Sequence, residues 1–301
     1  MWTPDGTDNP YGSPRPPGAC YCAGMTGQPL LIIDGDSFAH RAYHALPKTV
    51  RRAGGKGGGA IVGFANYLVR LYEAERPRAV FVGWDTLAEP NWRVREFAPY
   101  QSGREFDDEI VDQLDVLPRF VEACGFANGK AAGFEADDFL ATAVALEEQR
   151  GGTAIVASGD RDAFQLASDR TTILHPVKGG ELLRIGPAEV RDRYGVEPRQ
   201  VPDFIALRGD PSDKIPGARG VGPATAASLL KRYPDLESMI ADNRFPAQAN
   251  DLRLYKRIAT MIPTAPIGAL PADTKPTWKR AAELALEWEL SALGGRLLKF
   301  D

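Results

Sequence analysis

The segment Gly133-Phe134-Glu135-Ala136-Asp137-Asp138-Phe139 places three carboxylates within four residues, directly before an apolar run with helical spacing. The run continues to charged residues that end at Arg150, and this pattern predicts a helix that begins at the acids. One interpretation is a solvated first turn, which the helix dipole tolerates. Because three carboxylates this close repel one another, a bound cation is the other interpretation.

Three apolar runs elsewhere in the chain each end at or near an aspartate. They cover residues 29–34, 78–85 and 153–162, and their short, continuous apolar character predicts strands buried on both faces. We expect helices after the first run, over 60–75 and near 279–293, with a flexible glycine-rich loop at 54–59 between the first two. Strands that alternate with helices predict an α/β fold with a parallel sheet and right-handed crossovers.

Aspartates at the ends of parallel strands meet at one edge of the sheet, where such folds bind their ligands. Together with the acids of the quoted segment they form a set of seven carboxylates: Asp34, Asp85, Glu135, Asp137, Asp138, Asp160 and Asp162. Hard divalent cations prefer oxygen ligands of this kind. The sequence therefore predicts a divalent-cation site at this edge.

The composition is that of a globular protein with a substantial core, since 44% of the 301 residues are hydrophobic and 25% are charged. The formal net charge is -4, whereas a generic nucleic-acid binder is basic, so any such contact must be local or bridged by cations. Three cysteines without a disulfide framework predict a reducing compartment, and the pair Cys20 and Cys22 is a weak metal motif. No apolar run is long enough for a signal peptide or a membrane span, so we expect a cytoplasmic protein without a membrane partner.

Two further segments have the composition of phosphate contacts. Residues 92–104 interleave cations with aromatic rings, although an ordinary surface loop is equally consistent with this pattern. Gly220 and Gly222 bracket Val221 in a tight turn, and Pro223 suits the first position of a following helix. Backbone N–H groups at that helix start would form an anion site.

Together these motifs resemble the 5′-nuclease family, which includes the 5′-exonuclease domain of bacterial DNA polymerase I and the flap endonucleases. The resemblance implies a PIN-like α/β nuclease domain followed by a helix-three-turn-helix module that carries a helix-hairpin-helix DNA-binding turn. We accordingly expect the nuclease domain at 28–200, the DNA-binding module at 201–262, and a C-terminal segment at 263–301 that packs back on the nuclease domain. Residues 1–27, which are rich in proline and glycine and poor in aliphatic residues, predict a disordered tail. Without a polymerase region, the chain looks like the free-standing form of the family.

The resemblance also implies nine metal-binding carboxylates and two Mg²⁺ or Mn²⁺ ions. The carboxylates of the first ion are Asp34, Asp85, Glu135, Asp137 and Asp138. Those of the second ion are Asp160, Asp162, Asp210 and Asp213, the last two from the segment GDPSDKIPG.

The resemblance assigns further residues to catalysis and to DNA. The catalytic candidates are Arg93, Arg104 and Asp138. The DNA-binding candidates are Arg41, Tyr43, Tyr100, Lys214, Gly220, Val221, Gly222 and Thr225, with K⁺ as an additional ion at the hairpin.

Two residues depart from the family pattern. Gln101 stands where the family has a lysine that touches the scissile phosphate, and Ala224 stands where a lysine precedes the Thr-Ala pair. If 101–104 is helical, Arg104 lies on nearly the same face as Gln101, and we hypothesise that it takes over part of the lysine's role.

The reading that joins these features is a divalent-metal-dependent 5′-3′ exonuclease or flap endonuclease, a monomer that acts on flapped, nicked or branched duplex DNA. One alternative is a PIN-type ribonuclease, against which the hairpin at 220–222 argues. The other is a protein that binds branched DNA with weak catalysis, which the missing lysine makes conceivable. The intact acids argue against it, because a purely binding protein gains nothing from crowded negative charge.

Overall fold

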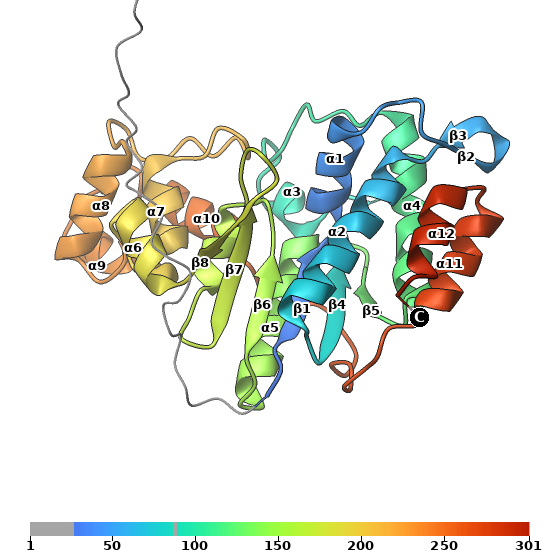
Figure 1. Ribbon diagram of the computed structural model, residues 1–301. Helices are drawn as coiled ribbons and strands as arrows, with labels where there is room; N and C mark the ends of the chain where they lie inside the picture. The colour runs from blue at the N-terminus through green and yellow to red at the C-terminus, as the bar shows by residue number, and fades with distance from the viewer. Residues whose placement is uncertain (1–26, 87–88, 301) are drawn as a thin grey trace, which may run out of the picture.

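The three apolar runs form the centre of a six-stranded sheet in the order β5-β4-β1-β6-β7-β8 (Figure 1). The structure is a computed structural model that describes residues 27–86 and 89–300, so positions 1–26 of the expected tail, with Cys20 and Cys22, lie outside the described residues. The strands are β1 Leu30–Asp34, β4 Ala79–Gly83, β5 Ala127–Gly129, β6 Ala154–Ala157, β7 Thr171–Pro176 and β8 Leu182–Ile185. The predicted α/β fold and its three central strands are confirmed.

All neighbouring strands of this sheet run parallel except β7 and β8, which are antiparallel. The sequence pattern does not indicate this antiparallel edge strand. The reversal takes place over the short turn that contains Gly179 and Gly180, both at positive φ, which glycine adopts without steric cost.

The sheet is buried on both faces because successive side chains of its strands point to opposite sides. In β1, Leu30 and Ile32 belong to one core cluster, and Leu31 and Ile33 belong to the other. All four are at most 1% exposed.

Five helices lie on the side of the sheet that Leu31 and Ile33 face: α1 Gly35–Ala45, α2 Gly59–Glu75, α4 Asp108–Ala123, α11 Trp278–Glu287 and α12 Ser291–Leu297. The ring of Trp278 packs edge-on against Tyr72 of α2 at 5.6 Å and against Phe126 at 5.7 Å. The single helix predicted near 279–293 is wrong, because the chain breaks at Glu289, whose φ is 58°.

The remaining helices lie on the other side or beyond the β8 edge. They are α3 Trp92–Glu96, α5 Ala136–Gln149, α6 Pro187–Tyr194, α7 Val201–Arg208, α8 Pro223–Arg232, α9 Leu236–Ala241 and α10 Ala249–Ala259 (Figure 1), with short 3-10 turns η1 Ala53–Gly55, η2 Asp162–Leu166 and η3 Pro198–Gln200. One core cluster joins Val156 of the sheet to Leu230 and Leu252 of these helices. The domain limits at 200 and 262 fall within this continuous core, and they stay predictions.

The loop expected at 54–59 contains regular structure. Strands β2 Arg51–Arg52 and β3 Lys56–Gly57 form an antiparallel hairpin. Asp112 of α4 accepts hydrogen bonds from Arg52 and from Lys56, the latter at 2.7 Å. These ion pairs supply the order that the glycine content alone does not predict.

None of the helices within residues 27–86 and 89–300 combines the length and the apolar character that crossing a bilayer requires.

Candidate active site

The strand ends deliver aspartates whose carboxylates are held by backbone and hydroxyl donors. Asp34 ends β1 and caps α1, with Oδ1 accepting from Ser37 N at 2.9 Å and Oδ2 accepting from Ser158 Oγ at 2.8 Å. Asp85 follows β4, and its Oδ1 accepts from Ala136 N at 2.7 Å, at the start of α5. Both side chains are therefore oriented before any ligand arrives.

A cavity of about 250 Å³ opens at this carboxyl edge of the sheet. Its acidic lining residues are Asp34, Asp36, Asp85, Glu135, Asp137 and Asp160. They come from the ends of three parallel strands and from the start of α5, as the sequence analysis expected, with Asp36 as an addition. The lining also contains two side chains with basic nitrogens, an amide and an aromatic ring: Arg104, His40, Gln101 and Phe106.

Burial, and to a smaller extent the charge of neighbouring acids, disfavours the ionised carboxylates in this cavity. Burial, and less strongly the charge of Asp85, raises the pKa of Asp34 to about 7. Burial likewise raises the pKa of Glu135 to about 7, against the opposing effect of Arg93. The pKa of Asp137 is raised well above its ordinary value by burial, then by Asp160 and Asp34. A divalent cation would relieve this repulsion.

Asp36 is a carboxylate that the sequence analysis did not assign. Its Oδ2 accepts from Asp85 N at 2.7 Å, and burial followed by the charge of Asp85 raises its pKa well above the ordinary value. The available signal was its position two residues after Asp34. An aspartate in the first turn of a helix is common for reasons of the helix dipole alone, so that position carried little information.

A second acidic group lies near Asp160 but does not line the cavity; its members are Asp162, Asp210 and Asp213. The pKa of Asp162 is raised well above its ordinary value by burial, then by Asp160, Asp213 and Asp210. Burial and the charge of Asp160 raise the pKa of Asp213 to about 6. Asp160, which the resemblance assigned to the second ion, is therefore close to acids of both groups.

The donor set fits hard divalent cations, because it consists of carboxylate oxygens that repel one another. Within residues 27–86 and 89–300, however, no three acidic, histidine or cysteine side chains already converge into a ligand cage. The individual ligand assignments therefore stay predictions.

The predicted metal ligand Asp138 and the predicted phosphate contact Arg93 form an ion pair with each other in the interior, and both assignments stay predictions. Asp138 is fully buried, and its two oxygens accept from Arg93 at 2.7 and 2.9 Å. Arg93 is 3% exposed, and its Nη1 also donates to Glu135 Oε2 at 2.7 Å. Neither residue lines the cavity, because the charged groups of both form hydrogen bonds within this buried ion-pair network.

Tyr43 and Tyr100, which the resemblance assigned to DNA binding, are both buried, and that assignment stays a prediction. Tyr43 is 4% exposed and donates its hydroxyl hydrogen bond to Asp107, and Tyr100 is 6% exposed and donates to Glu135 Oε2 at 3.2 Å. Their rings belong to the core. Arg41 of α1 is half-buried close to Gly159, beside the cavity.

Gln101 and Arg104 both point to the acidic groups, but not because they share a helix. Residues 98–103 form turns, and Gln101 has a φ of 50°. Gln101 Nε2 lies 3.3 Å from Asp213 Oδ1, and Arg104 Nη2 donates to the same oxygen at 3.1 Å. The helical premise is wrong, and the turn brings the two side chains together instead.

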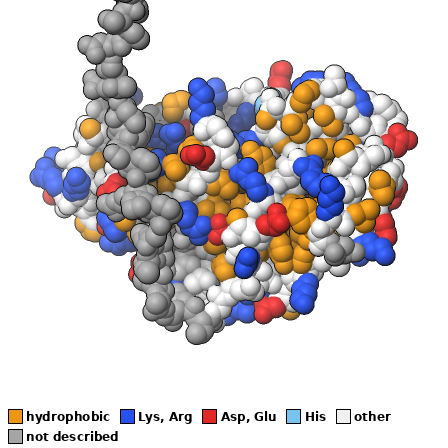
Figure 2. Space-filling model, viewed as in Figure 1, with side chains coloured by type: hydrophobic (Ala, Val, Ile, Leu, Met, Phe, Trp, Pro, Cys, Tyr) orange, Lys and Arg blue, Asp and Glu red, His pale blue; other side chains and the backbone are white. Residues whose placement is uncertain are grey.

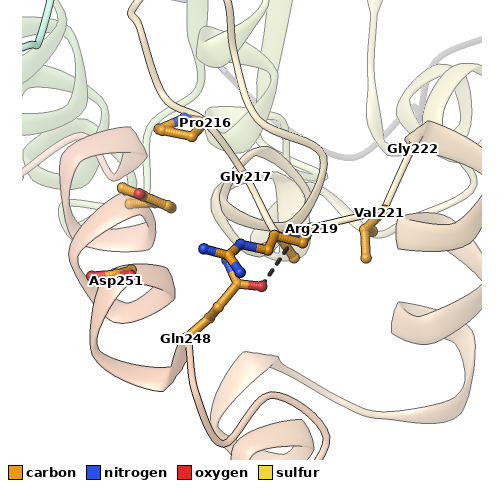
Figure 3. Close-up of a pocket in the computed structure, with 10 residues that line it drawn as sticks. Pro216, Gly217, Arg219, Val221, Gly222, Gln248 and Asp251 are labelled. Atoms are coloured by element: carbon orange, nitrogen blue, oxygen red, sulfur yellow. Dashed lines mark hydrogen bonds between the residues drawn. The ribbon is translucent and has the colours of Figure 1, made fainter.

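The glycine turn forms one wall of a second cavity, of about 560 Å³, between residues 216–222 and the start of α10 (Figure 3). Arg219 N donates to Gln248 Oε1 at 3.1 Å across it. The predicted DNA contacts Lys214, Gly220, Gly222 and Thr225 are exposed, and Val221 is half-buried. Gly222 caps α8 without a side-chain hydrogen bond. Lysine and arginine side chains also stand at the end of the molecule where α8 and α9 lie (Figure 2).

Two family descriptions match the chain. Residues 29–195, more than half of it, match the 5′-3′ exonuclease N-terminal resolvase-like domain, and residues 196–280 match the 5′-3′ exonuclease C-terminal SAM fold. A 5′-3′ exonuclease of Mycobacterium tuberculosis is 32% identical over 90% of this chain and 97% of its own length. DNA polymerase I of Mycobacterium bovis is 40% identical over 70% of this chain, which corresponds to only 24% of the polymerase.

Solved structures share the fold at low sequence identity. A bacteriophage T5 flap endonuclease, solved as a pseudo-enzyme-product complex with DNA and metal ions, has a TM-score of 0.65 and 16% identity, and the match covers 90% of this chain and 98% of that one. Human GEN1, solved with Holliday junction DNA, has a TM-score of 0.58 and 14% identity over 90% of this chain and 71% of GEN1. With both domain descriptions matched and a relative aligned over nearly its full length, this chain belongs to the 5′-3′ exonuclease family.

Proposed function

We propose that this protein is a divalent-metal-dependent nuclease that hydrolyses phosphodiester bonds of DNA at 5′ ends, flaps or nicks. The observation that carries the proposal is that six carboxylates line one cavity at the carboxyl ends of three parallel strands. Family membership and the metal- and DNA-containing T5 complex support it.

Two groups of carboxylates would hold the ions, Mg²⁺ or Mn²⁺. Asp34, Asp85, Glu135 and Asp137 would serve the first, with Asp36 within reach of the same cavity. Asp160, Asp162, Asp210 and Asp213 would serve the second. Ions bound there would lower the pKa of attacking water and neutralise charge on the scissile phosphate.

Arg104 is a positively charged side chain in the cavity lining, and this side chain is 44% exposed. Its guanidinium can donate to a phosphate oxygen while it remains near Asp213. Gln101, on the same carboxylate oxygen, offers a neutral amide donor, which stabilises negative charge less than the lysine typical of the family.

The DNA duplex would bind at the glycine turn. Close approach of a phosphate to the backbone is possible because Gly220 and Gly222 have no side chains, and the start of α8 presents N–H groups. The same turn would hold K⁺, which would supply positive charge for a phosphate. We propose that a monomer performs the reaction, a state that light scattering with and without DNA would test.

The decisive assay uses 5′-labelled flap DNA, a matched RNA flap and a plain duplex, each with Mg²⁺ or with EDTA. Cleavage of the DNA flap only with Mg²⁺ is expected, and Asp160→Asn should abolish it while DNA binding persists. Asp115→Asn on α4, whose side chain is 69% exposed, is the matched control and should remain active. Undiminished cleavage in excess EDTA refutes the metal mechanism, and preferred cleavage of RNA favours the ribonuclease alternative.

A further inference from the structure

We propose that Arg93 is a positioning residue that fixes Glu135 so that one of its carboxylate oxygens faces the cavity; this inference rests on the proposed function. Glu135 lines the acidic cavity, whereas Arg93 lies behind it and is 3% exposed. Arg93 therefore acts on the site only through another residue.

The two oxygens of Glu135 have different environments. Oε2 accepts from Arg93 Nη1 at 2.7 Å and from Tyr100 OH at 3.2 Å. Oε1 has no hydrogen-bond partner among residues 27–86 and 89–300. Holding Oε2 in this way fixes the rotamer and leaves Oε1 as the oxygen available to a cation.

Arg93 also donates hydrogen bonds to acceptors other than Glu135, and these fix the position of its guanidinium group. Its Nε donates to Ile258 O at 2.9 Å, near the end of α10, and its two terminal nitrogens donate to Asp138 at 2.9 and 2.7 Å. Nη2 also lies 3.3 Å from Thr260 O. The planar fork of arginine can meet all these acceptors at once, which a lysine ammonium cannot do with the same geometry.

This network also joins the chain that leaves α10 to the helix that carries the acids. Asp138 Oδ1 accepts from Ile262 N at 3.1 Å, and Thr142 Oγ1 accepts from Ala265 N at 2.9 Å. The residues that follow α10 are thus fastened to the first turns of α5. The orientation of Glu135 therefore depends, through Arg93 and Asp138, on residues 258–262 at the carboxyl end of the proposed DNA-binding module.

The test measures Mn²⁺ affinity of the free protein, without DNA, from the electron paramagnetic resonance signal of unbound Mn²⁺. Arg93→Lys keeps the positive charge but loses the planar, forked guanidinium group. Mutation of a residue that orients a metal ligand typically lowers metal affinity by about 10–100-fold. We expect at least about a tenfold loss of Mn²⁺ affinity in this variant.

Arg78→Lys is the matched control, because Arg78 is also a buried arginine, 7% exposed, that pairs with the buried carboxylate of Glu147. Arg78 lies at the amino end of β4, whereas the cavity lies at the carboxyl ends of the strands. It should lose comparable thermal stability but keep the wild-type Mn²⁺ affinity. Equal loss of affinity in both variants would mean general loosening of the fold and would overturn the proposal.

Tyr100→Phe covers the case in which Arg93→Lys does not fold. It removes only the hydroxyl that donates to Glu135 Oε2, and a smaller loss of Mn²⁺ affinity is expected. Wild-type affinity in Tyr100→Phe, or in a folded Arg93→Lys, overturns the positioning role. A wild-type protein that binds no Mn²⁺ would refute the proposed function instead, so the two failures are distinguishable.

Discussion

Asp34 and Glu135 would be only partly ionised near neutral pH in the metal-free protein, since the pKa of each is raised to about 7. Their ordinary values are 3.8 and 4.5. Between these values and about 7, the folded protein binds protons that the unfolded chain has already released. The free energy of unfolding that these groups contribute is therefore fully present below pH 4 and is lost as the pH rises through about 7.

We accordingly expect the melting temperature in EDTA to fall between pH 5 and pH 7.5, and saturating Mg²⁺ to restore much of the loss at the higher pH. Each ~1 kcal/mol corresponds to about 2–4 °C in domains of 150–250 residues, so a shift of several degrees is measurable by calorimetry. Asp34→Asn should flatten the pH dependence. A melting temperature that rises over this interval in EDTA would contradict the buried acidic cavity.

Gln101 and Arg104 allow a second test with single side chains. Because a lysine at 101 would aim a full positive charge at the developing charge of the phosphate, Gln101→Lys should raise the single-turnover cleavage rate, by up to about a hundredfold. Arg104→Ala should lower the rate more than Gln101→Ala does, since Arg104 is the charged donor on Asp213. Rates are compared at saturating Mg²⁺.

If Gln101→Lys leaves the rate unchanged and Arg104→Ala is harmless, the turn at 98–104 does not contact the phosphate. Arg119→Ala, another exposed arginine paired with a carboxylate, is the control and should keep the wild-type rate.

At the level of elements, the glycine turn before α8 can be altered without disturbing the fold. A Cβ added to Gly222 meets no atom within 4 Å, and its φ of -91° suits any residue. Gly220 is a poorer choice because its φ is 72°. Gly222→Val should therefore weaken duplex binding by blocking a phosphate rather than by unfolding the module.

The measurement is duplex affinity over a salt series in EDTA, with Gly268→Val as the control, since a Cβ at Gly268 also meets no atom within 4 Å. Loss of a phosphate contact reduces the slope of log affinity against log salt by about 1. Equal slopes for both variants would exclude the turn from the DNA interface.

The sequence predicted the elements whose signal is local. Strands β1, β4 and β6 are continuous apolar runs, and the acids at 135–138 begin a helix where the spacing placed it. β8 was missed because its run is short and half-exposed, and the break at Glu289 was missed because no proline or glycine marks it. The β2–β3 hairpin depends on ion pairs with α4, which residue spacing does not reveal.

Across the whole molecule, the candidate site could be predicted at the level of which segments meet, but not which side chains face the cavity. Arg93 and Asp138 have the residue types of a phosphate contact and a metal ligand, yet they neutralise each other in the interior. Asp36, by contrast, reaches the cavity from a position that helix preference alone would explain. The distinction depends on burial of the packed chain, and burial is a tertiary property.

The raised pKa values of the cavity acids have a consequence for any ion that enters. At pH 7 a metal-free site retains protons on some of these oxygens, and a cation must displace them. Ion uptake should therefore acidify the solution, and the heat measured by titration calorimetry should differ between Tris and HEPES, whose ionisation enthalpies differ. The slope of that heat against buffer enthalpy counts the protons released, and the part that comes from Asp34 and Glu135, whose pKa values are about 7, should disappear at pH 9.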